Sequence, residues 1–292
     1  MTGYLLNISI IIFSNDRLFN GRIHTIIFLV MHMALTVGSN FIKKNLPLLS
    51  KKGRDEKGLF IVEGEKFVSE IPLRWPLRFY LMSETFAMKS ILPAYENRAP
   101  VYTAPDHLYK KLSDTVTPQG IMAVCEKKQI SPENLIKDDG LLLLCENLAD
   151  PGNVGTLIRT ACAANAAGVI LTKGSAELYS PKVIRACAGS LFHIPCAEDA
   201  DALSAVRYLK AGGFLLAAAH LNGGVSYYDA DMTKACCILI GNEARGLSDE
   251  LSSFAQLLVK IPMSGGIDSL NAAVAGSILL YEAVRQRAVR GH

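Results

Sequence analysis

The sequence lacks the short motifs that identify the ligand of many α/β proteins. Its seven cysteines lie in apolar segments, with no C-x-x-C pair and no Cys/His spacing typical of a metal site. It contains neither the G-x-G-x-x-G turn of a dinucleotide-binding fold nor the lysine of a P-loop. These absences argue against a bound metal and against a nicotinamide-dependent oxidoreductase. They favour reduced core cysteines in a cytoplasmic protein.

Long hydrophobic runs are also missing. The apolar stretches LLNISIIIF and IHTIIFLV of residues 1–32 are each too short to span a bilayer, and polar residues separate them. The segment has neither the basic start nor the small-residue cleavage site of a secretory signal. We interpret residues 1–32 as an apolar leader. One interpretation is that the start codon is assigned too early and that translation begins at Met31 or Met33. The other is that the segment associates with a membrane or targets an organelle.

Charge is distributed unevenly along the 292 residues, whose net charge is only +3. Residues 33–137 hold 16 lysines and arginines against 11 aspartates and glutamates, a net charge of +5. Residues 138–292 hold 12 against 15, a net charge of −3. A basic part beside a mildly acidic part suggests that the basic part binds a polyanion, although a solvated basic face has the same composition.

The pattern of elements predicts two α/β domains. Residues 33–126 alternate short strands with helices, beginning with a helix at Ser39, and indicate a small α/β domain. Residues 127–138 are polar and read as a linker. Residues 139–292 alternate apolar strands with helices, which predicts a parallel sheet covered on both faces. The cations near one end of the first domain, which are candidates for polyanion binding, are Lys43, Lys44, Lys51, Lys52 and Arg54.

Three stretches of the second domain combine glycines and polar residues at the ends of predicted strands, where α/β proteins bind ligands. They are DPGNVGTLIRTA (150–161), LIGNEARGL (239–247) and IPMSGGIDSLNAAVAGSILLYE (261–282). Each alone has a purely structural interpretation. The first is an ordinary strand-turn-helix, the second precedes a helix cap at Ser248, and the third contains a possible cap at Ser269.

In this order and spacing, the three stretches resemble the motifs of the SpoU/TrmH family of RNA ribose 2′-O-methyltransferases. Two earlier stretches, SNFIKKNLPLLSKKGRDEKGLFIVEG (39–64) and LSDTVTPQGIMAV (112–124), resemble the amino-terminal substrate-binding domain of that family. The resemblance covers about residues 39–287. It implies a small RNA-binding α/β domain followed by a parallel-sheet SPOUT domain with a trefoil knot, assembled as a homodimer.

The resemblance also implies S-adenosylmethionine as the cofactor and no metal. By the family motifs, backbone contacts to the cofactor come from Gly241, Ile261 and Leu270. The residues expected nearby are Asn242, Glu243, Met263, Ser269 and Asn271. Glu243 and Asn271 could instead support the loops.

Arg159 is the first motif's only cation, and the resemblance implies that it activates the ribose hydroxyl. Because an arginine scarcely deprotonates in a protein, we expect it to hold ribose and phosphate and to stabilise developing negative charge. Asn153 and Glu243 are expected to orient it. The alternative is a structural salt bridge from Arg159 to Glu146 or Glu243.

A catalytically silent RNA-binding or ribosome-assembly protein could lack Arg159 or the Gly-Asn-Glu loop, and this sequence has both. The target nucleotide is not specified by any motif. The presence of the amino-terminal domain favours large-subunit ribosomal RNA as the substrate, with transfer RNA as the alternative.

Overall fold

The structure is a computed structural model that describes residues 6–19, 22–89, 95, 97–221, 224–265 and 269–290. Two compact units divide the chain, one comprising residues 1–126 and the other residues 127–292. Part of the glycine-rich SGGIDSLN stretch and the ends of the chain lie outside the described residues.

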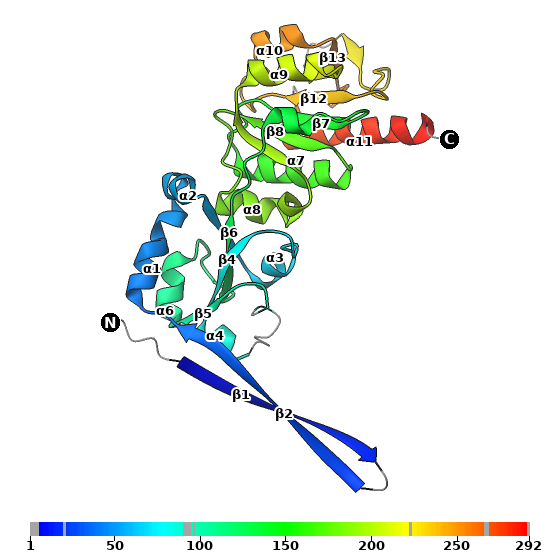
Figure 1. Ribbon diagram of the computed structural model, residues 1–292. Coiled ribbons are helices and arrows are strands. Elements are labelled where there is room, and N and C mark those ends of the chain that lie inside the picture. The colour runs from blue at the N-terminus through cyan, green and yellow to red at the C-terminus, as the bar shows by residue number, and fades with distance from the viewer. Residues whose placement is uncertain are drawn as a thin grey trace. The chain divides into compact units, whose positions relative to one another are not determined.

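The amino-terminal unit contains a six-stranded mixed sheet in the order β1-β2-β5-β4-β6-β3. The bounds of its strands are β1 Leu6–Phe19, β2 Arg22–Thr36, β3 Leu59–Glu63, β4 Leu77–Ser83, β5 Val101–Ala104 and β6 Ile121–Glu126. Much of the proposed leader therefore forms strands: β1 pairs antiparallel with β2, whose end pairs with β5 (Figure 1).

Short helices complete this unit. They are α1 Ser39–Asn45, η1 Leu46–Leu49, α2 Lys51–Lys57, α3 Glu65–Ser69, α4 Glu84–Ala87, α6 Asp106–Tyr109 and η2 Lys110–Leu112. The single helix expected from Ser39 is wrong in detail. The 3-10 turn η1, which begins at Leu46 and has Pro47 in its first turn, separates α1 from α2, because proline cannot donate the backbone hydrogen bond that a continuous helix needs. Ser50 then caps α2.

The carboxy-terminal unit contains a seven-stranded sheet in the order β11-β13-β10-β12-β7-β8-β9, in which every pairing is parallel. The strands are β7 Leu141–Cys145, β8 Gly168–Thr172, β9 Cys196–Ala200, β10 Leu215–Ala219, β11 Val225–Ser226, β12 Cys236–Ile240 and β13 Leu257–Lys260. Every residue of β7, β8 and β12 is buried. The predicted parallel sheet with two covered faces is confirmed.

Helices lie on both faces of this sheet, with α9 and α10 on one side and α7, α8 and α11 on the other (Figure 1). Their bounds are η3 Pro132–Leu135, α7 Pro151–Ala163, α8 Pro181–Cys187, η4 Ser190–Phe192, α9 Ala202–Ala211, α10 Asp249–Phe254 and α11 Ala272–Arg290. Leu135, in the stretch read as a linker, is fully buried in the core beneath α9.

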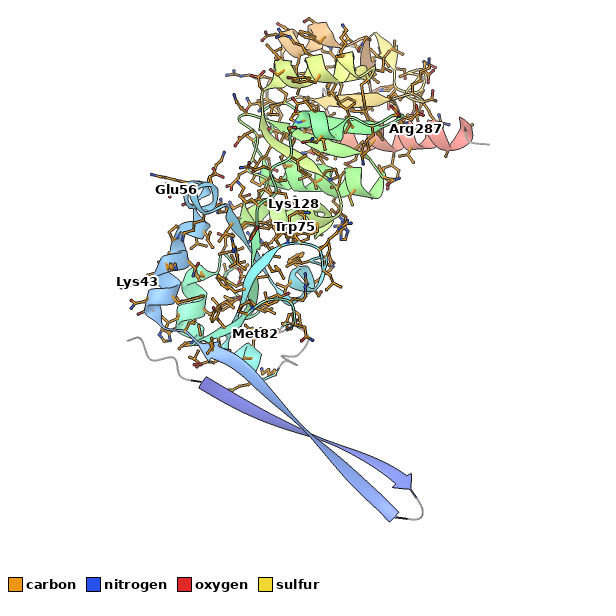
Figure 2. All side chains as sticks on the ribbon, viewed as in Figure 1. Lys43, Glu56, Trp75, Met82, Lys128 and Arg287 are labelled. Carbon is orange, nitrogen blue, oxygen red and sulfur yellow. The ribbon has the colours of Figure 1, made fainter. Side chains whose placement is uncertain are left out.

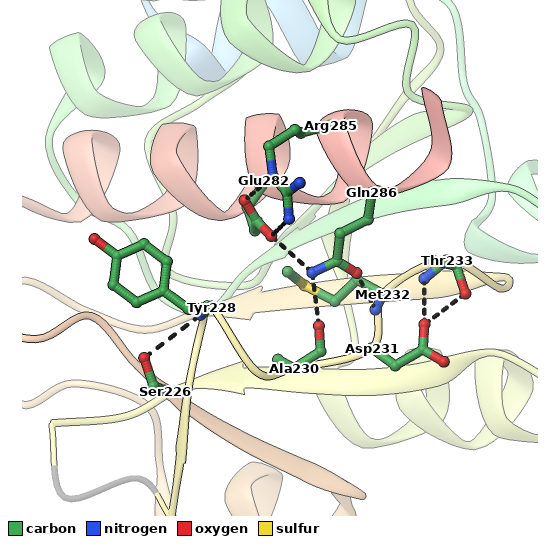
Figure 3. A network of polar contacts seen from close by, with 9 residues as sticks. All are labelled: Ser226, Tyr228, Ala230, Asp231, Met232, Thr233, Glu282, Arg285 and Gln286. Carbon is green, nitrogen blue, oxygen red and sulfur yellow. Dashed lines mark hydrogen bonds and ion pairs between the residues drawn. The ribbon is translucent and has the colours of Figure 1, made fainter. Parts of the chain in front are cut away.

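The last helix, α11, packs closely on α7. A Cβ on Gly276 would lie 2.6 Å from Leu157 Cδ2, so a side chain at this position would force Leu157 to shift. Farther along α11, Gln286 accepts a hydrogen bond from the Met232 amide and donates to the Ala230 carbonyl (Figure 3). These contacts hold the helix on the segment that precedes β12.

Six of the seven cysteines are buried and Cys162 is partly exposed; all seven are free thiols. Burial, with a smaller contribution from the Glu243 carboxylate, raises the pKa of the Cys145 thiol to about 12. A thiol with this pKa stays protonated at neutral pH and is a poor nucleophile. Cys145 therefore belongs to the core, although it ends the strand that leads to the first motif.

Candidate functional site

The second and third motifs meet in one pocket at the carboxyl ends of the parallel strands. Its volume is about 470 Å³, within the range typical of cofactor sites. All eight residues that the family motifs place at or near the cofactor line it: Gly241, Asn242, Glu243, Ile261, Met263, Ser269, Leu270 and Asn271. The structure thus brings together residues that lie up to 30 positions apart in the sequence.

The loop after β12 is folded by its own asparagine. The backbones of Asn242 and Gly246 exchange two hydrogen bonds, of 3.0 and 2.8 Å. The side-chain oxygen of Asn242 accepts from the amides of Ala244 and Arg245. Its Nδ2 donates to the Asn147 carbonyl at 2.8 Å. Asn242 therefore shapes one wall of the pocket and ties it to the turn that follows β7.

Gly241 lies where this loop closes on itself. A Cβ at position 241 would lie 2.1 Å from both Gly246 C and Leu247 N. The glycine is therefore required by the backbone of its own loop. A larger residue would disrupt the wall of the pocket before it met any ligand.

Glu146, the residue after β7, holds the far end of the same loop. Its carboxylate accepts hydrogen bonds from Ser248 Oγ at 2.6 Å and from the Ser248 amide at 2.8 Å. Ser248 Oγ also accepts from the Leu251 amide and caps α10, as the sequence predicted. The loop that lines the pocket is thus braced at both ends by residues 146 and 147.

The first motif contributes the start of α7. Asp150 caps the helix by accepting from the Asn153 amide at 2.8 Å. The Asn153 side chain donates to Glu243 Oε1 at 2.9 Å and accepts from Asn271 Nδ2 at 2.9 Å. One residue from each of the three motifs therefore joins a single chain of hydrogen bonds beside the pocket.

Asn271 has a second role. Its Oδ1 accepts from the amides of Ala273 and Val274, so it caps α11. The cap suggested at Ser269 is therefore wrong, because α11 begins at Ala272 and Ser269 lies too far from its first amides. Capping fixes Asn271 at the point where its Nδ2 reaches Asn153.

Arg159 lies on the exposed side of α7, one and a half turns beyond Asn153. Within the described part of the chain it makes no hydrogen bond or ion pair. The expected contact with Asn153 and Glu243 is not present, because these two side chains bond to each other. The alternative salt bridges to Glu146 and Glu243 are not formed either, and the Glu146 carboxylate accepts its hydrogen bonds from Ser248. The guanidinium is available to a ligand.

The sequence did not point to the end of β10. Ala219, His220 and Leu221 line the pocket, and the His220 amide bonds to the Val259 carbonyl of β13. The signal was available in principle, because the segment FLLAAAH is an apolar strand ending in a polar residue. Only the strand order places β10 between β12 and β13, next to both motif loops.

The predicted basic cluster divides into two kinds of residue. Lys43, Lys44, Lys51 and Lys52 are exposed on α1 and α2, and Figure 2 shows Lys43 projecting from α1. Arg54 is only 4% exposed and donates to the Leu48 carbonyl at 2.8 Å. Including Arg54 among RNA-binding residues is therefore wrong, since its guanidinium joins α2 to the preceding turn.

Among the described residues, no group of three or more histidines, cysteines or carboxylates is placed to hold a metal ion. No helix in the same part of the chain has the length and apolar character needed to cross a membrane.

Comparison with known proteins agrees with this architecture. Residues 140–281 match the SpoU rRNA Methylase family, and residues 39–123 match the MRM3-like substrate binding domain. The 23S rRNA (guanosine(2553)-2′-O)-methyltransferase RlmP of Bacillus subtilis is 33% identical over 242 residues, covering 80% of this chain and 92% of that protein. The 23S rRNA (uridine(2479)-2′-O)-methyltransferase of Streptomyces viridochromogenes is 32% identical, covering 82% and 86%.

Solved structures show the same relationship. The AdoMet-bound rRNA methyltransferase from Sinorhizobium meliloti superposes with a TM-score of 0.77 at 32% identity, covering 86% of this chain and 97% of that one. The family matches over residues 39–123 and 140–281 lie one in each unit of the chain. The chain therefore belongs to the SpoU family of rRNA methylases.

Proposed function

We propose that this protein transfers a methyl group from S-adenosylmethionine to a ribose 2′-hydroxyl of large-subunit ribosomal RNA. The observation that carries the proposal is the pocket formed by the second and third motifs, to which the Asn153–Glu243–Asn271 hydrogen bonds join the first motif. The relatives named above are 23S rRNA 2′-O-methyltransferases, which supports both the reaction and the class of RNA.

The pocket fits the cofactor. Its volume is sufficient, and its walls combine the backbone of the 241–247 loop with apolar side chains such as Ile261, Met263 and Leu270. Backbone groups can bond the adenine and amino acid parts, and the apolar walls can contact the rest. The bound cofactor supplies a methyl group on a positively charged sulfur.

The chain's own residues then have distinct tasks. Asn153, Glu243 and Asn271 hold the start of α7 against the 241–247 loop. This contact fixes the helix that carries Arg159 relative to the loop that lines the cofactor pocket. The exposed Arg159 binds the target ribose and its phosphate and stabilises the negative charge that develops on the 2′-oxygen. The rate then derives mainly from positioning, because the displacement requires an in-line approach.

Two further features belong to the proposal. The first is a trefoil knot in the segment from β12 to α11, supported by the way that the 241–247 loop and residues 261–271 enclose one pocket. The second is a homodimer that acts in the cytoplasm. Exposed apolar side chains on α11 support dimerisation, since Val274, Tyr281 and Val289 are 48%, 50% and 68% exposed.

The experiment that tests the function uses the purified full-length chain, cofactor labelled in its methyl group, and separate samples of 23S ribosomal RNA and transfer RNA. Nuclease digestion followed by chromatography identifies the labelled nucleoside. We expect label in a 2′-O-methylated nucleoside from 23S RNA. Label in a base, or transfer to transfer RNA alone, contradicts the proposal.

A further inference from the structure

The amino-terminal unit contains a second pocket, of about 290 Å³, between α4, α6 and the start of β6. Neither the cofactor nor the predicted lysine cluster accounts for it. Its lining includes the aromatic ring of Phe86, the amide of Gln119 and the cations Lys89 and Lys110. Its volume is too small for a folded RNA helix and suits a single nucleotide.

The aromatic wall of this pocket is held in place by a glycine. Gly120 has a φ of +94°, and a Cβ there would lie 2.7 Å from Phe86 Cβ and 2.8 Å from Ser83 Oγ. The half-buried Phe86 therefore sits directly over the Gly120 backbone, and its amide is fixed by Ser83 Oγ at 3.2 Å. A ring held this way can stack on a base with little loss of side-chain entropy.

The amide of Gln119 is oriented as well. Its Oε1 accepts from the Glu65 amide at 2.9 Å, which leaves Nε2 without a partner among the described residues. The loop before it is tied to the end of β3, where Glu63 Oε1 accepts from Ser113 Oγ at 2.6 Å and from Thr115 Oγ1 at 3.2 Å. This loop is the LSDTVTPQG stretch of the sequence, and it presents a fixed donor to the pocket.

The charge around the pocket suits a phosphate. Lys89 and Lys110 are exposed, while the acidic lining residue, Asp106, already accepts two hydrogen bonds from Thr85. Lys110 begins η2, and both α6 and η2 contact α1, which carries the exposed Lys43 and Lys44. The pocket therefore opens beside a positively charged surface.

We propose that this pocket receives one unpaired nucleotide of the RNA substrate. The base stacks on Phe86, Gln119 Nε2 donates to an acceptor on the base edge, and Lys89 and Lys110 bind the flanking phosphates. Proteins that read RNA sequence commonly bind unstacked bases in this way. The inference rests on the proposed function, and it makes the amino-terminal unit a reader of a specific single-stranded nucleotide.

The test compares three variants of the full-length protein by RNA-binding affinity and by KM for RNA. Phe86→Leu keeps an apolar side chain over Gly120 but removes the stacking ring. Gln119→Glu keeps an oxygen for the Glu65 amide but removes the donor, and Lys110→Gln removes one charge. We expect the first two to weaken RNA binding roughly 5- to 100-fold, the range for loss of one stacked or hydrogen-bonded base. Cofactor affinity should not change.

Matched controls keep the inference falsifiable. Phe79→Leu removes another half-buried ring of the same unit, and Arg74→Gln removes an exposed charge; neither residue lines the pocket. Thermal melting confirms that each variant folds. If Phe86→Leu and Gln119→Glu melt like their controls and bind RNA like the parent, the pocket inference is wrong. If the parent itself transfers no methyl group to RNA, the proposed function fails instead.

Discussion

Asn153 Nδ2 donates a hydrogen bond of 2.9 Å to Glu243 Oε1, joining two motifs that lie 90 residues apart. Asn153 in turn accepts from Asn271, so the amide must present its oxygen to one neighbour and its nitrogen to the other. This dual requirement explains why an asparagine suits the position, since a carboxylate could not donate and a leucine could do neither.

Asn153→Asp should therefore weaken cofactor binding more than its small change in volume suggests. The new carboxylate would face Glu243 at hydrogen-bond distance, so two charged acceptors would repel each other where a donor and an acceptor are now paired. Calorimetric titration with the cofactor measures the loss, with Asn153→Ala as the control that removes the hydrogen bonds without adding a charge. A loss in Asn153→Asp that is no larger than the loss in Asn153→Ala contradicts the prediction.

Gly241→Ala should abolish cofactor binding and lower the melting temperature. A Cβ at this position would lie 2.1 Å from the backbone of Gly246 and Leu247, so the loop that lines the pocket must shift. Gly224→Ala is the matched control, because a Cβ there meets nothing within 4 Å. If calorimetry finds that Gly241→Ala binds the cofactor as tightly as the parent, the assignment of this loop to the cofactor site is wrong.

Arg159→Ala should reduce methyl transfer by about 10²-fold or more, the scale seen when a transition-state donor is removed. Stability and cofactor affinity should stay near those of the parent, because Arg159 makes no hydrogen bond or ion pair in the described structure. Arg159→Lys should recover little, since an ammonium does not reproduce the planar fork of donors. Single-turnover transfer to RNA, run beside thermal melting, separates these effects. Full activity in Arg159→Ala would mean that another group activates the ribose hydroxyl.

Replacing Lys43, Lys44, Lys51 and Lys52 with glutamine should weaken RNA binding with little effect on stability, because the Lys52–Glu56 ion pair is exposed to solvent. The salt dependence should flatten by roughly 0.7 to 0.9 in slope for each lysine that contacts a phosphate. Arg54→Gln should behave differently and cost about 1–3 kcal/mol of stability, because its buried guanidinium bonds the Leu48 carbonyl. Affinity measured over a range of salt concentrations, with chemical unfolding of each variant, distinguishes the two. If the salt dependence of RNA affinity is unchanged in the lysine variant, these lysines do not contact RNA phosphates.

Tyr281→Glu should convert the proposed dimer into a monomer. Tyr281 is 50% exposed on α11 and lies two turns from the exposed Val274, so the two form an apolar stripe. A buried charge at the centre of that interface would be unpaired. Tyr208→Glu on α9, which replaces an equally exposed tyrosine, should leave assembly unchanged. Sedimentation at micromolar concentration is the measurement. A parent that sediments as a monomer contradicts the proposed dimer itself.

The sequence by itself determined the class of fold and which residues meet at the carboxyl edge of the parallel sheet. Apolar strands such as 141–145 and 236–240 could only be buried on both faces, which requires a parallel sheet with helices on each side. Since the carboxyl ends of parallel strands share one edge, the polar residues that follow them had to meet there. The eight residues that the family resemblance placed at or near the cofactor line one pocket at this edge.

The tertiary structure alone decided the partners of individual side chains. Asn153 and Glu243 bond to each other rather than to Arg159, Glu146 braces Ser248, and Arg54 is buried while the neighbouring lysines are exposed. The second pocket beneath Phe86 was equally invisible, because α4, α6 and Gly120 come from separate parts of the chain. Local propensity and periodicity assign a residue to an element and a face. The distance between two side chains depends on strand order and helix packing, which bring together residues that are remote in the sequence.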